Sequence, residues 1–310
     1  MTPNPIWITL DSPDPDARST EFLRHSNPYG VILFARHLKS RRQVAELCQA
    51  IHGSTEGFSP LIALDQEGGR VSRLAAIGYD LPGAESCAAD PARAKATGAE
   101  AGEILRGLGF DVDFAPVADL GPAHPGTGLE GRLFGDDPRT VTSCCAAFLA
   151  GLHDTGIEGC LKHFPGLGGT RLDSHRVLPF VEGGLTDRQD HLAPYRELAG
   201  LVPYVMVGHA AYAFLDGRSP ATLHPGTYEL LSSLGFKGLS VTDDLSMGAV
   251  AALGDLPGLV LKSLSAGASL ALWVSSQEAT LRALDSVASE PLWLARRDAL
   301  AHCRVGSGTP

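Results

Sequence analysis

The chain has 310 residues, of which 44% are hydrophobic and 19% charged, which argues against a disordered chain and against a small disulfide-stabilised domain. Its formal net charge is −10, from 35 acidic and 25 basic residues, and no basic patch stands out. We therefore expect neither nucleic acid nor an anionic membrane as a partner. The length suits one barrel-sized domain or two small ones.

The ends and the cysteines indicate the cellular compartment. The segment Met1–Trp7 has no basic region followed by a long apolar one, and no run in the chain reaches the ~18 apolar residues of a spanning helix. We therefore expect no signal peptide, no membrane span and a cytoplasmic protein. The cysteines form no C-x-x-C pair, so we expect reduced, mostly buried thiols; they are Cys48, Cys87, Cys144, Cys145, Cys160 and Cys303.

Short apolar runs alternate with segments of helical periodicity along the whole chain. Most of these runs are almost continuously apolar, which is typical of strands covered on both faces. The runs that predict strands are Ile6–Leu10, Gly30–Phe34, Leu61–Leu64, Val112–Val117, Cys160–Phe164, Tyr204–Val207, Gly238–Val241 and Ser269–Val274. The segments that predict helices include Ser40–Ile51, Pro91–Leu108, Pro138–His153, Asp187–Leu198, Gly226–Leu234 and Pro257–Leu264. Residues suited to cap these helices are Ser40, Asp90 and Thr186.

Eight strand candidates that alternate with helices predict an α/β fold, a single-domain (β/α)8 TIM-type barrel. A doubly wound open sheet is the alternative. No linker divides the chain, so we expect the barrel to extend over residues 1–304 and the tail 305–310 to be frayed. Polar residues cluster where the predicted strands end, and in a barrel these ends meet at one mouth, where the functional site belongs.

The richest polar segment runs from Lys162-His163, at a strand end, through three glycines to Asp173-Ser174-His175. A turn in this loop would bring the Asp173 carboxylate to the His175 imidazole, orienting the ring and favouring its protonated form. The alternative is that Asp173 caps a turn and His175 is simply exposed.

Asp243 and Asp244 follow the seventh predicted strand. Adjacent side chains point in different directions, so one carboxylate can face the mouth as nucleophile or base while the other accepts local hydrogen bonds. Helix capping by Asp244, with Asp243 solvated, is the alternative.

Two further segments carry residues suited to ligand binding. Asp65 ends the third predicted strand and can accept hydrogen bonds from substrate hydroxyls, with Arg73 or Arg70 reaching the same ligand. Arg132 lies in a loop before the helix that begins at Pro138. An internal salt bridge and a buried structural arginine are the respective alternatives.

The familiar cofactor motifs are missing. The sequence has no G-x-x-x-x-G-K-[ST], no H-E-x-x-H and no G-x-S-x-G, and its glycine-rich loop at 166–171 fails the G-x-G-x-x-G pattern. The missing motifs therefore argue against a metal site, a nucleotide site and a serine-hydrolase site.

Four motifs taken together resemble those of the family 3 glycoside hydrolases, specifically the bacterial β-N-acetylhexosaminidases of the NagZ type. They are DQEGGRV at 65–71, KHFPG at 162–166, DSH at 173–175 and TDDLSM at 242–247. The order and spacing of the four are far more specific than any one of them. The resemblance runs from about residue 30 to residue 247.

This resemblance implies a cofactor-free barrel that removes terminal β-linked N-acetylglucosamine with retention of configuration. The nucleophile falls on Asp243 and the proton donor on His175, assisted by Asp173. The positions that would bind the sugar are Asp65, Arg73, Arg132, Lys162 and His163. The sequence departs from the family pattern at Leu133, Leu167 and Gly169, which bears on loop behaviour and substrate preference.

The implied substrate is a small saccharide or a muropeptide, N-acetylglucosamine on 1,6-anhydro-N-acetylmuramic acid, released during peptidoglycan recycling. A β-glucosidase or another exo-glycosidase of the same family, a sugar-binding barrel without activity and a metal-dependent barrel hydrolase are the alternatives. The sequence leaves the oligomeric state open, and we favour a monomer.

Overall fold

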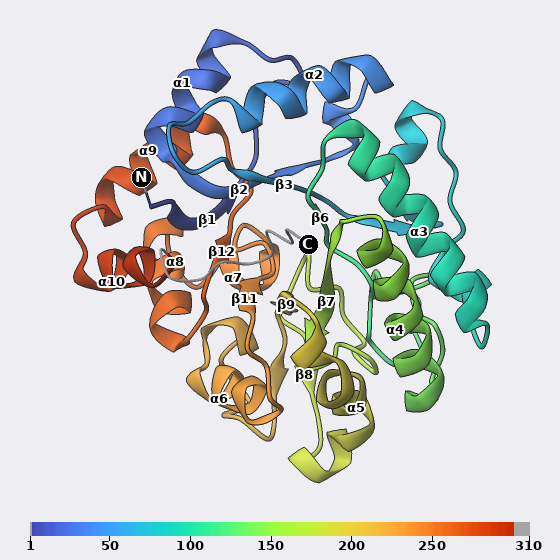
Figure 1. Ribbon diagram of the computed structural model, residues 1–310. Helices are drawn as coiled ribbons and strands as arrows, with labels where there is room; N and C mark the ends of the chain where they lie inside the picture. Colours follow the sequence, from blue (N-terminus) through green and yellow to red (C-terminus); the bar gives the residue numbers. More distant parts are fainter. Residues whose placement is uncertain (1, 301–310) are drawn as a thin grey trace.

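The computed structural model describes residues 2–300; the predicted tail 305–310 and Cys303 lie outside this part. Eight parallel strands form one sheet in the order β11-β9-β7-β6-β3-β2-β1-β12. Together with the surrounding helices they make the predicted (β/α)8 barrel (Figure 1). The strands are β1 (Asn4–Ile8), β2 (Pro28–Leu33), β3 (Leu61–Leu64), β6 (Val112–Asp113), β7 (Glu158–Phe164), β9 (Tyr204–Val207), β11 (Leu239–Thr242) and β12 (Ala271–Leu272).

The barrel closes between its last two strands. Val241 of β11 forms a parallel bridge with Leu270, which lies just before β12. The Leu272 N–H donates to the Thr242 hydroxyl at 2.9 Å, which extends this contact toward the carboxyl end of both strands. Two short pairs lie outside the barrel: β4 (Gln66–Gly68) with β5 (Val71–Ser72), and β8 (Phe180–Val181) with β10 (Ala211–Tyr212).

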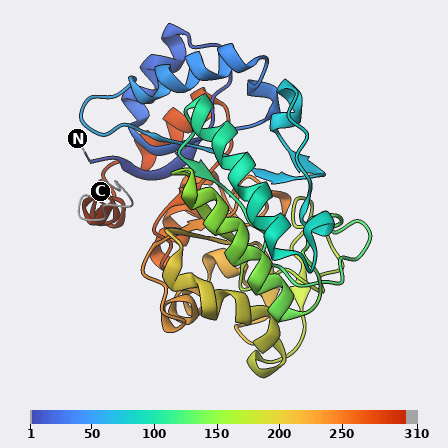
Figure 2. The same ribbon diagram turned by 45° about the vertical axis from the view of Figure 1, so that its right-hand side comes forward.

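Helices surround the barrel, and α3 and α4 lie side by side on its outer surface (Figure 2). The predicted caps at Ser40 and Asp90 are confirmed, because their side chains accept from the N–H groups of Gln43 and Arg93. The helices are α1 (Ala17–Ser26), α2 (Arg41–His52), α3 (Pro91–Leu108), α4 (Pro138–Asp154), α5 (Gln189–Leu198), α6 (Pro225–Ser233), α7 (Gly248–Ala251), α8 (Leu256–Ala266), α9 (Gln277–Val287) and α10 (Pro291–Leu300).

Aromatic side chains fill the amino-terminal half of the barrel interior. The Trp7 ring meets Phe114 and Tyr204 edge to face, with centroids 5.1 and 6.4 Å apart. Position 30 has to be glycine, because a Cβ there would lie 2.2 Å from a ring carbon of Trp7. The interior is therefore packed at this end, so the space for a ligand is expected at the carboxyl end of the barrel.

Three sequence predictions need correction. The fourth strand ends at Asp113, and the rest of the predicted run contributes an isolated bridge between Val117 and Lys162; Pro116, which has no N–H, lies between the strand and the bridge. Helix α5 begins at Gln189, two residues later than predicted. The Asp187 carboxylate, rather than Thr186, accepts from the Gly184 N–H and closes a 3-10 turn over Leu185–Arg188. Helices α1, α9 and α10 were not among the predicted segments.

His37 is buried in the short 3-10 turn Ala35–His37 that follows β2. Its Nδ1 accepts from the Phe34 N–H and its Nε2 donates to the Leu10 carbonyl, both at 2.9 Å, so the neutral ring satisfies both partners. Burial lowers the pKa of His37 to about 4.

The prediction of reduced, buried cysteines is confirmed in the described part of the chain. Free, buried thiols are found at Cys48, Cys87, Cys144, Cys145 and Cys160. Among residues 2–300, no helix combines the length and the apolar character needed to cross a bilayer.

Candidate active site

A cavity of about 400 Å³ opens at the carboxyl ends of the strands, a size within the usual range for small-molecule sites. All eight residues predicted to be catalytic or sugar-binding line this one cavity. They are Asp65, Arg73, Arg132, Lys162, His163, Asp173, His175 and Asp243. The strand ends therefore meet as a barrel requires, and an open-sheet crevice is excluded.

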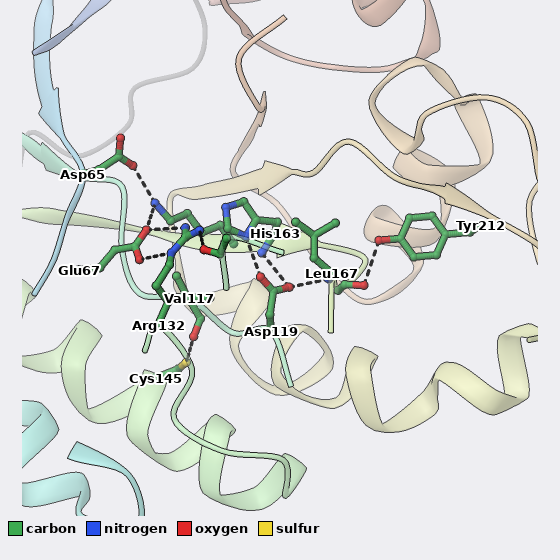
Figure 3. Close-up of polar contacts among 12 residues, drawn as sticks. Asp65, Glu67, Val117, Asp119, Arg132, Cys145, His163, Leu167 and Tyr212 are labelled. Carbon is green, nitrogen blue, oxygen red and sulfur yellow. Dashed lines mark hydrogen bonds and ion pairs between the residues drawn. The ribbon is translucent and has the colours of Figure 1, made fainter. Parts of the chain in front are cut away.

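One side of the cavity is a buried cluster of alternating charges (Figure 3). Lys162 Nζ lies 2.7 Å from both Asp65 Oδ1 and Glu67 Oε1. The Arg132 guanidinium donates two hydrogen bonds to the Glu67 carboxylate, to Oε2 at 2.7 Å and to Oε1 at 2.9 Å. Glu67 therefore joins the two cations, and its side chain is only 4% exposed. Burial raises the pKa of Glu67, but the adjacent Lys162 and Arg132 outweigh it and hold the pKa well below its usual range.

A third carboxyl group, Asp113 at the end of β6, lies fully buried near this cluster. It accepts one hydrogen bond, from the Gln66 N–H at 2.9 Å, and its Oδ2 has no partner in the described structure. Burial raises the pKa of Asp113 well above its ordinary value. Burial therefore favours the protonated form of Asp113, while the carboxyl groups of Asp65 and Glu67 pair with the two cations of the cluster.

His163 is anchored from behind by Asp119, which is fully buried. The Asp119 carboxylate lies 2.7 Å from His163 Nδ1 and also accepts the Leu167 N–H at 2.7 Å (Figure 3). Burial raises the pKa of Asp119, but His163 and the hydrogen bonds outweigh it, so the pKa is lowered and the group is a carboxylate. Because a carboxylate only accepts, Nδ1 carries a hydrogen and Nε2 is the ring nitrogen left for a ligand.

Lys162 and His163 line the same cavity although they are neighbours in β7. In a regular strand, neighbouring side chains point to opposite faces. The pairing of β7 with β9 shifts register between Lys162 and Phe164. This irregularity lets both side chains face the mouth.

The structure distinguishes the two adjacent aspartates after β11. Both oxygens of Asp244 are engaged: Oδ1 accepts from the N–H groups of Ser246 and Val274, and Oδ2 accepts the Ser246 hydroxyl. Asp243 accepts one hydrogen bond, from the Asp244 N–H to Oδ1 at 2.8 Å. Its own N–H donates to the Val207 carbonyl, which ties the residue to β9. Asp243 is therefore the carboxylate available to a ligand.

Charge and hydrogen bonding favour the ionised form of Asp243. Burial raises its pKa, but the imidazoles of His209 and His163 and the hydrogen bond from Asp244 outweigh it, so the pKa is lowered. His209 is fully buried; its Nε2 donates to the Asp244 carbonyl at 2.9 Å, and Nδ1 accepts the Thr222 hydroxyl at 2.8 Å. Burial lowers the pKa of His209, and its Nε2–H holds the carbonyl of Asp244, the residue that follows Asp243.

The loop after β7 forms the pair expected from the sequence. His175 Nδ1 and the His175 N–H both lie within 2.9 Å of Asp173 Oδ1, at 2.7 and 2.9 Å. Burial raises the pKa of Asp173, but the hydrogen bonds from His175 outweigh it, so the pKa is lowered. Asp173 is therefore an acceptor, which leaves His175 Nε2 free to carry a transferable proton. The His175 side chain is 62% exposed, as access to a substrate requires.

Arginines gather at the rim of the cavity. Arg73 lines the cavity, and its buried Nε has no hydrogen-bond partner in the described structure. Arg36 stacks over the Phe34 ring at 4.6 Å and forms no ion pair within residues 2–300. Arg70, the alternative to Arg73, pairs with Glu130 at 3.2 Å.

Sequence reasoning missed two residues of the site, Glu67 and Asp119. Glu67 lies within a quoted motif, two positions after Asp65, but nothing local shows that it faces Lys162. Asp119 follows the fourth strand run by two residues, so its place after a predicted strand was the one available signal. Within residues 2–300, no three His, Cys, Asp or Glu side chains converge in a way that could hold a metal ion.

Comparison with known proteins identifies the family. Residues 7–294 match the model of the glycosyl hydrolase family 3 N-terminal domain. A protein of Bordetella avium named beta-hexosaminidase is 34% identical over 284 residues, which cover 88% of this chain and 81% of that protein.

Two solved structures share the fold over nearly the whole chain. A family 3 β-N-acetylglucosaminidase from Paenibacillus has a TM-score of 0.85 at 29% identity, covering 98% of this chain, which spans 64% of that enzyme. NagZ from Neisseria gonorrhoeae, in complex with N-trifluoroacetyl-D-glucosamine, has a TM-score of 0.80 at 27% identity, covering 97% of this chain and 90% of that one. The chain belongs to glycoside hydrolase family 3 and is a glycoside hydrolase.

Proposed function

We propose that the protein is a retaining exo-β-N-acetylglucosaminidase with Asp243 as nucleophile, His175 as acid and base, and Asp173 as the residue that orients His175. One observation carries the proposal. Asp243, unlike Asp244, has a carboxylate oxygen that is unengaged in the described part of the chain, and it lines the same cavity as the Asp173–His175 pair. A nucleophile and a proton donor at one cavity are what retaining hydrolysis needs.

The reaction follows two steps. In the first, an Asp243 oxygen forms a bond to C1 of the sugar while the glycosidic bond breaks, and His175 Nε2–H protonates the departing oxygen. In the second, water attacks C1, His175 Nε2 takes its proton, and Asp243 is released as a carboxylate. After donating its proton, His175 is neutral and adds no second negative charge beside Asp243.

The buried cluster supplies the sugar-binding groups. Asp65 and Lys162 hold each other in place, as do Glu67 and Arg132, so a sugar hydroxyl meets groups whose positions are already set. Hydrogen bonds to such charged groups contribute roughly 1.5–3 kcal/mol each. With Arg73 at the rim and His163 Nε2 inside, these groups would close the cavity around one terminal sugar, which favours exo action.

The natural substrate proposed here is a muropeptide carrying N-acetylglucosamine on 1,6-anhydro-N-acetylmuramic acid, met in the cytoplasm during peptidoglycan recycling. Muropeptides carry carboxylates on the leaving side. The rim arginines Arg36, Arg70 and Arg73 provide cationic groups at the mouth of a chain whose net charge is −10. The names of the Paenibacillus and Neisseria relatives support the N-acetylglucosamine part of the proposal.

Covalent trapping tests the nucleophile. The protein is mixed with a 2-acetamido-5-fluoro glycosyl reagent, digested and analysed by mass spectrometry, with Asp243→Asn as the control. We expect the label on the peptide that contains Asp243 and none in the variant. A label on another peptide, or turnover by the variant at the wild-type rate, contradicts the assignment.

A panel of chromogenic glycosides tests the sugar. We expect 4-nitrophenyl β-N-acetylglucosaminide to be hydrolysed far faster than the matching β-glucoside. Faster hydrolysis of the glucoside would indicate a β-glucosidase. Hydrolysis of neither glycoside would indicate a sugar-binding barrel without activity.

A further inference from the structure

The loop that carries Asp173 and His175 begins with a short segment, Pro165–Gly168, called here the loop base. Its polar backbone groups are held by side chains from three other parts of the chain. Asp119 accepts the Leu167 N–H at 2.7 Å, and the Tyr212 hydroxyl donates to the Gly166 carbonyl at 2.9 Å (Figure 3). The loop base is therefore fastened both to the segment after β6 and to β10.

Arg188 supplies the third attachment, through two hydrogen bonds. Its guanidinium donates to the Gly166 carbonyl at 2.7 Å through one terminal nitrogen and to the Gly168 carbonyl at 3.2 Å through the other. The two carbonyls flank Leu167, whose side chain lines the cavity. One planar group thus sets the spacing of the loop base beneath the active site.

Among residues 2–300, Arg188 is a buried cation without a neighbouring carboxylate. The residue is 6% exposed, and no carboxylate lies within 4 Å of it in the described part of the chain. Its Nε has no partner there either. A buried cation without a counter-ion is unfavourable, so the two loop carbonyls are what stabilise this guanidinium. The buried Arg188 guanidinium and the two carbonyls of the loop base therefore stabilise each other.

The loop base packs closely against the segment that follows β6. A Cβ at Gly168 would lie 1.8 Å from the Leu120 carbonyl oxygen, so the backbone is pressed against the segment behind it. Farther along, the loop is more exposed: Leu172, Val177 and Phe180 are 46–51% exposed. Beyond the loop base, the backbone near the pair is tied to α7, where the Gly248 N–H donates to the His175 carbonyl at 3.1 Å.

We infer that Arg188 is a positioning residue for the proton donor: by fixing the loop base, it places the Asp173–His175 pair over the cavity that Asp243 lines. This inference rests on the proposed roles of those three residues. Arg188 itself does not line the cavity. Its loss would therefore weaken proton donation to the leaving group while leaving the nucleophile and the sugar-binding cluster in place.

Leaving-group dependence tests this directly. Wild type, Arg188→Met and Arg188→Lys are assayed for kcat/KM on aryl β-N-acetylglucosaminides from 2,4-dinitrophenyl, which leaves without protonation, to phenyl, which needs it. The matched control is Arg196→Met on α5, since Arg196 is exposed and, among residues 2–300, its side chain hydrogen-bonds the Gln189 side chain alone. The ratio of the phenyl to the dinitrophenyl value does not depend on how much of a variant is folded.

We expect Arg188→Met to lower that ratio about tenfold, part of the ~100-fold or more that a positioned acid contributes. Arg188→Lys should restore part of the ratio, and Arg196→Met should match wild type. An unchanged ratio in both Arg188 variants, even with lower rates on all substrates, overturns the inference and leaves the proposed function intact. A wild-type protein inactive on the whole series refutes both. If Arg188→Met does not fold, Arg188→Lys carries the test through the same ratio.

Discussion

Replacing Glu67 by Gln keeps the shape of the side chain and removes the charge that joins Lys162 to Arg132. Two buried cations would then face a neutral amide, with one carboxylate, Asp65, left to balance them. Removing one partner of a buried ion pair destabilises a protein by about 3–5 kcal/mol. Because Lys162 keeps Asp65 at 2.7 Å and Arg132 keeps the Gly128 carbonyl at 2.8 Å, we expect the lower value, about 3 kcal/mol.

Urea unfolding followed by tryptophan fluorescence, together with calorimetry, measures this effect. A loss of about 3 kcal/mol corresponds to a fall in Tm of roughly 5–10 °C in a chain of this size, and total stabilities of about 5–15 kcal/mol leave the variant folded. The matched control is Glu130→Gln, which removes the same charge from the exposed pair with Arg70. We expect that change to cost about 0–1 kcal/mol.

Activity should follow the same order. Glu67→Gln should raise KM for aryl N-acetylglucosaminides, because Lys162 and Arg132 lose the group that fixes their positions, whereas Glu130→Gln should leave KM near that of wild type. Equal stabilities of the two variants, within about 1 kcal/mol, would refute the reasoning. It would mean that water or a shifted neighbour compensates the buried charges at little cost.

Three more predictions follow from single residues. His175→Ala should slow phenyl glycosides at least ~100-fold more than dinitrophenyl ones in kcat/KM; equal losses would count against proton donation. Gly30→Ala should lower the free energy of unfolding by about 1–3 kcal/mol in urea, since the new methyl overlaps a tryptophan ring; wild-type stability would show that the ring can move. Lowering the pH from about 6.5 to 4 should destabilise the protein through His37, because the unfolded ring takes up a proton there and the folded ring, with a pKa of about 4, does not. That loss is about 3 kcal/mol at full extent, and calorimetry of His37→Gln should show a flatter pH dependence.

The sequence located the strands well, because continuous apolar runs bounded by turns and helices are a local signal. Each of the eight predicted strands overlaps one strand of the barrel. The predicted ends of strands and helices were less accurate where a single residue bears on them, as Pro116 does for the fourth strand and Asp187 for helix α5. Helices α1, α9 and α10 were not predicted; their packing on the barrel is tertiary information.

The site divides along the same line. Residue types and their order along the chain placed Asp65, Lys162, His175 and Asp243 at strand ends or in the loops after them, and the resemblance to family 3 glycoside hydrolases suggested their roles. Which partner each group would have was not readable. Asp119 reaches His163 across 44 positions and Glu67 reaches Arg132 across 65, distances over which sequence carries no periodic signal.

The sequence by itself favoured a barrel over an open sheet and placed the polar candidates at the carboxyl ends of its strands, since these depend on local pattern and residue type. Only the tertiary structure decided that Asp243 rather than Asp244 has a free oxygen, that Glu67 is the centre of a buried charge cluster, and that Arg188 supports the loop. The physical reason is the same in each case. Burial and hydrogen bonding depend on which distant segments pack together, and these two factors set the charge and orientation of every group in the site.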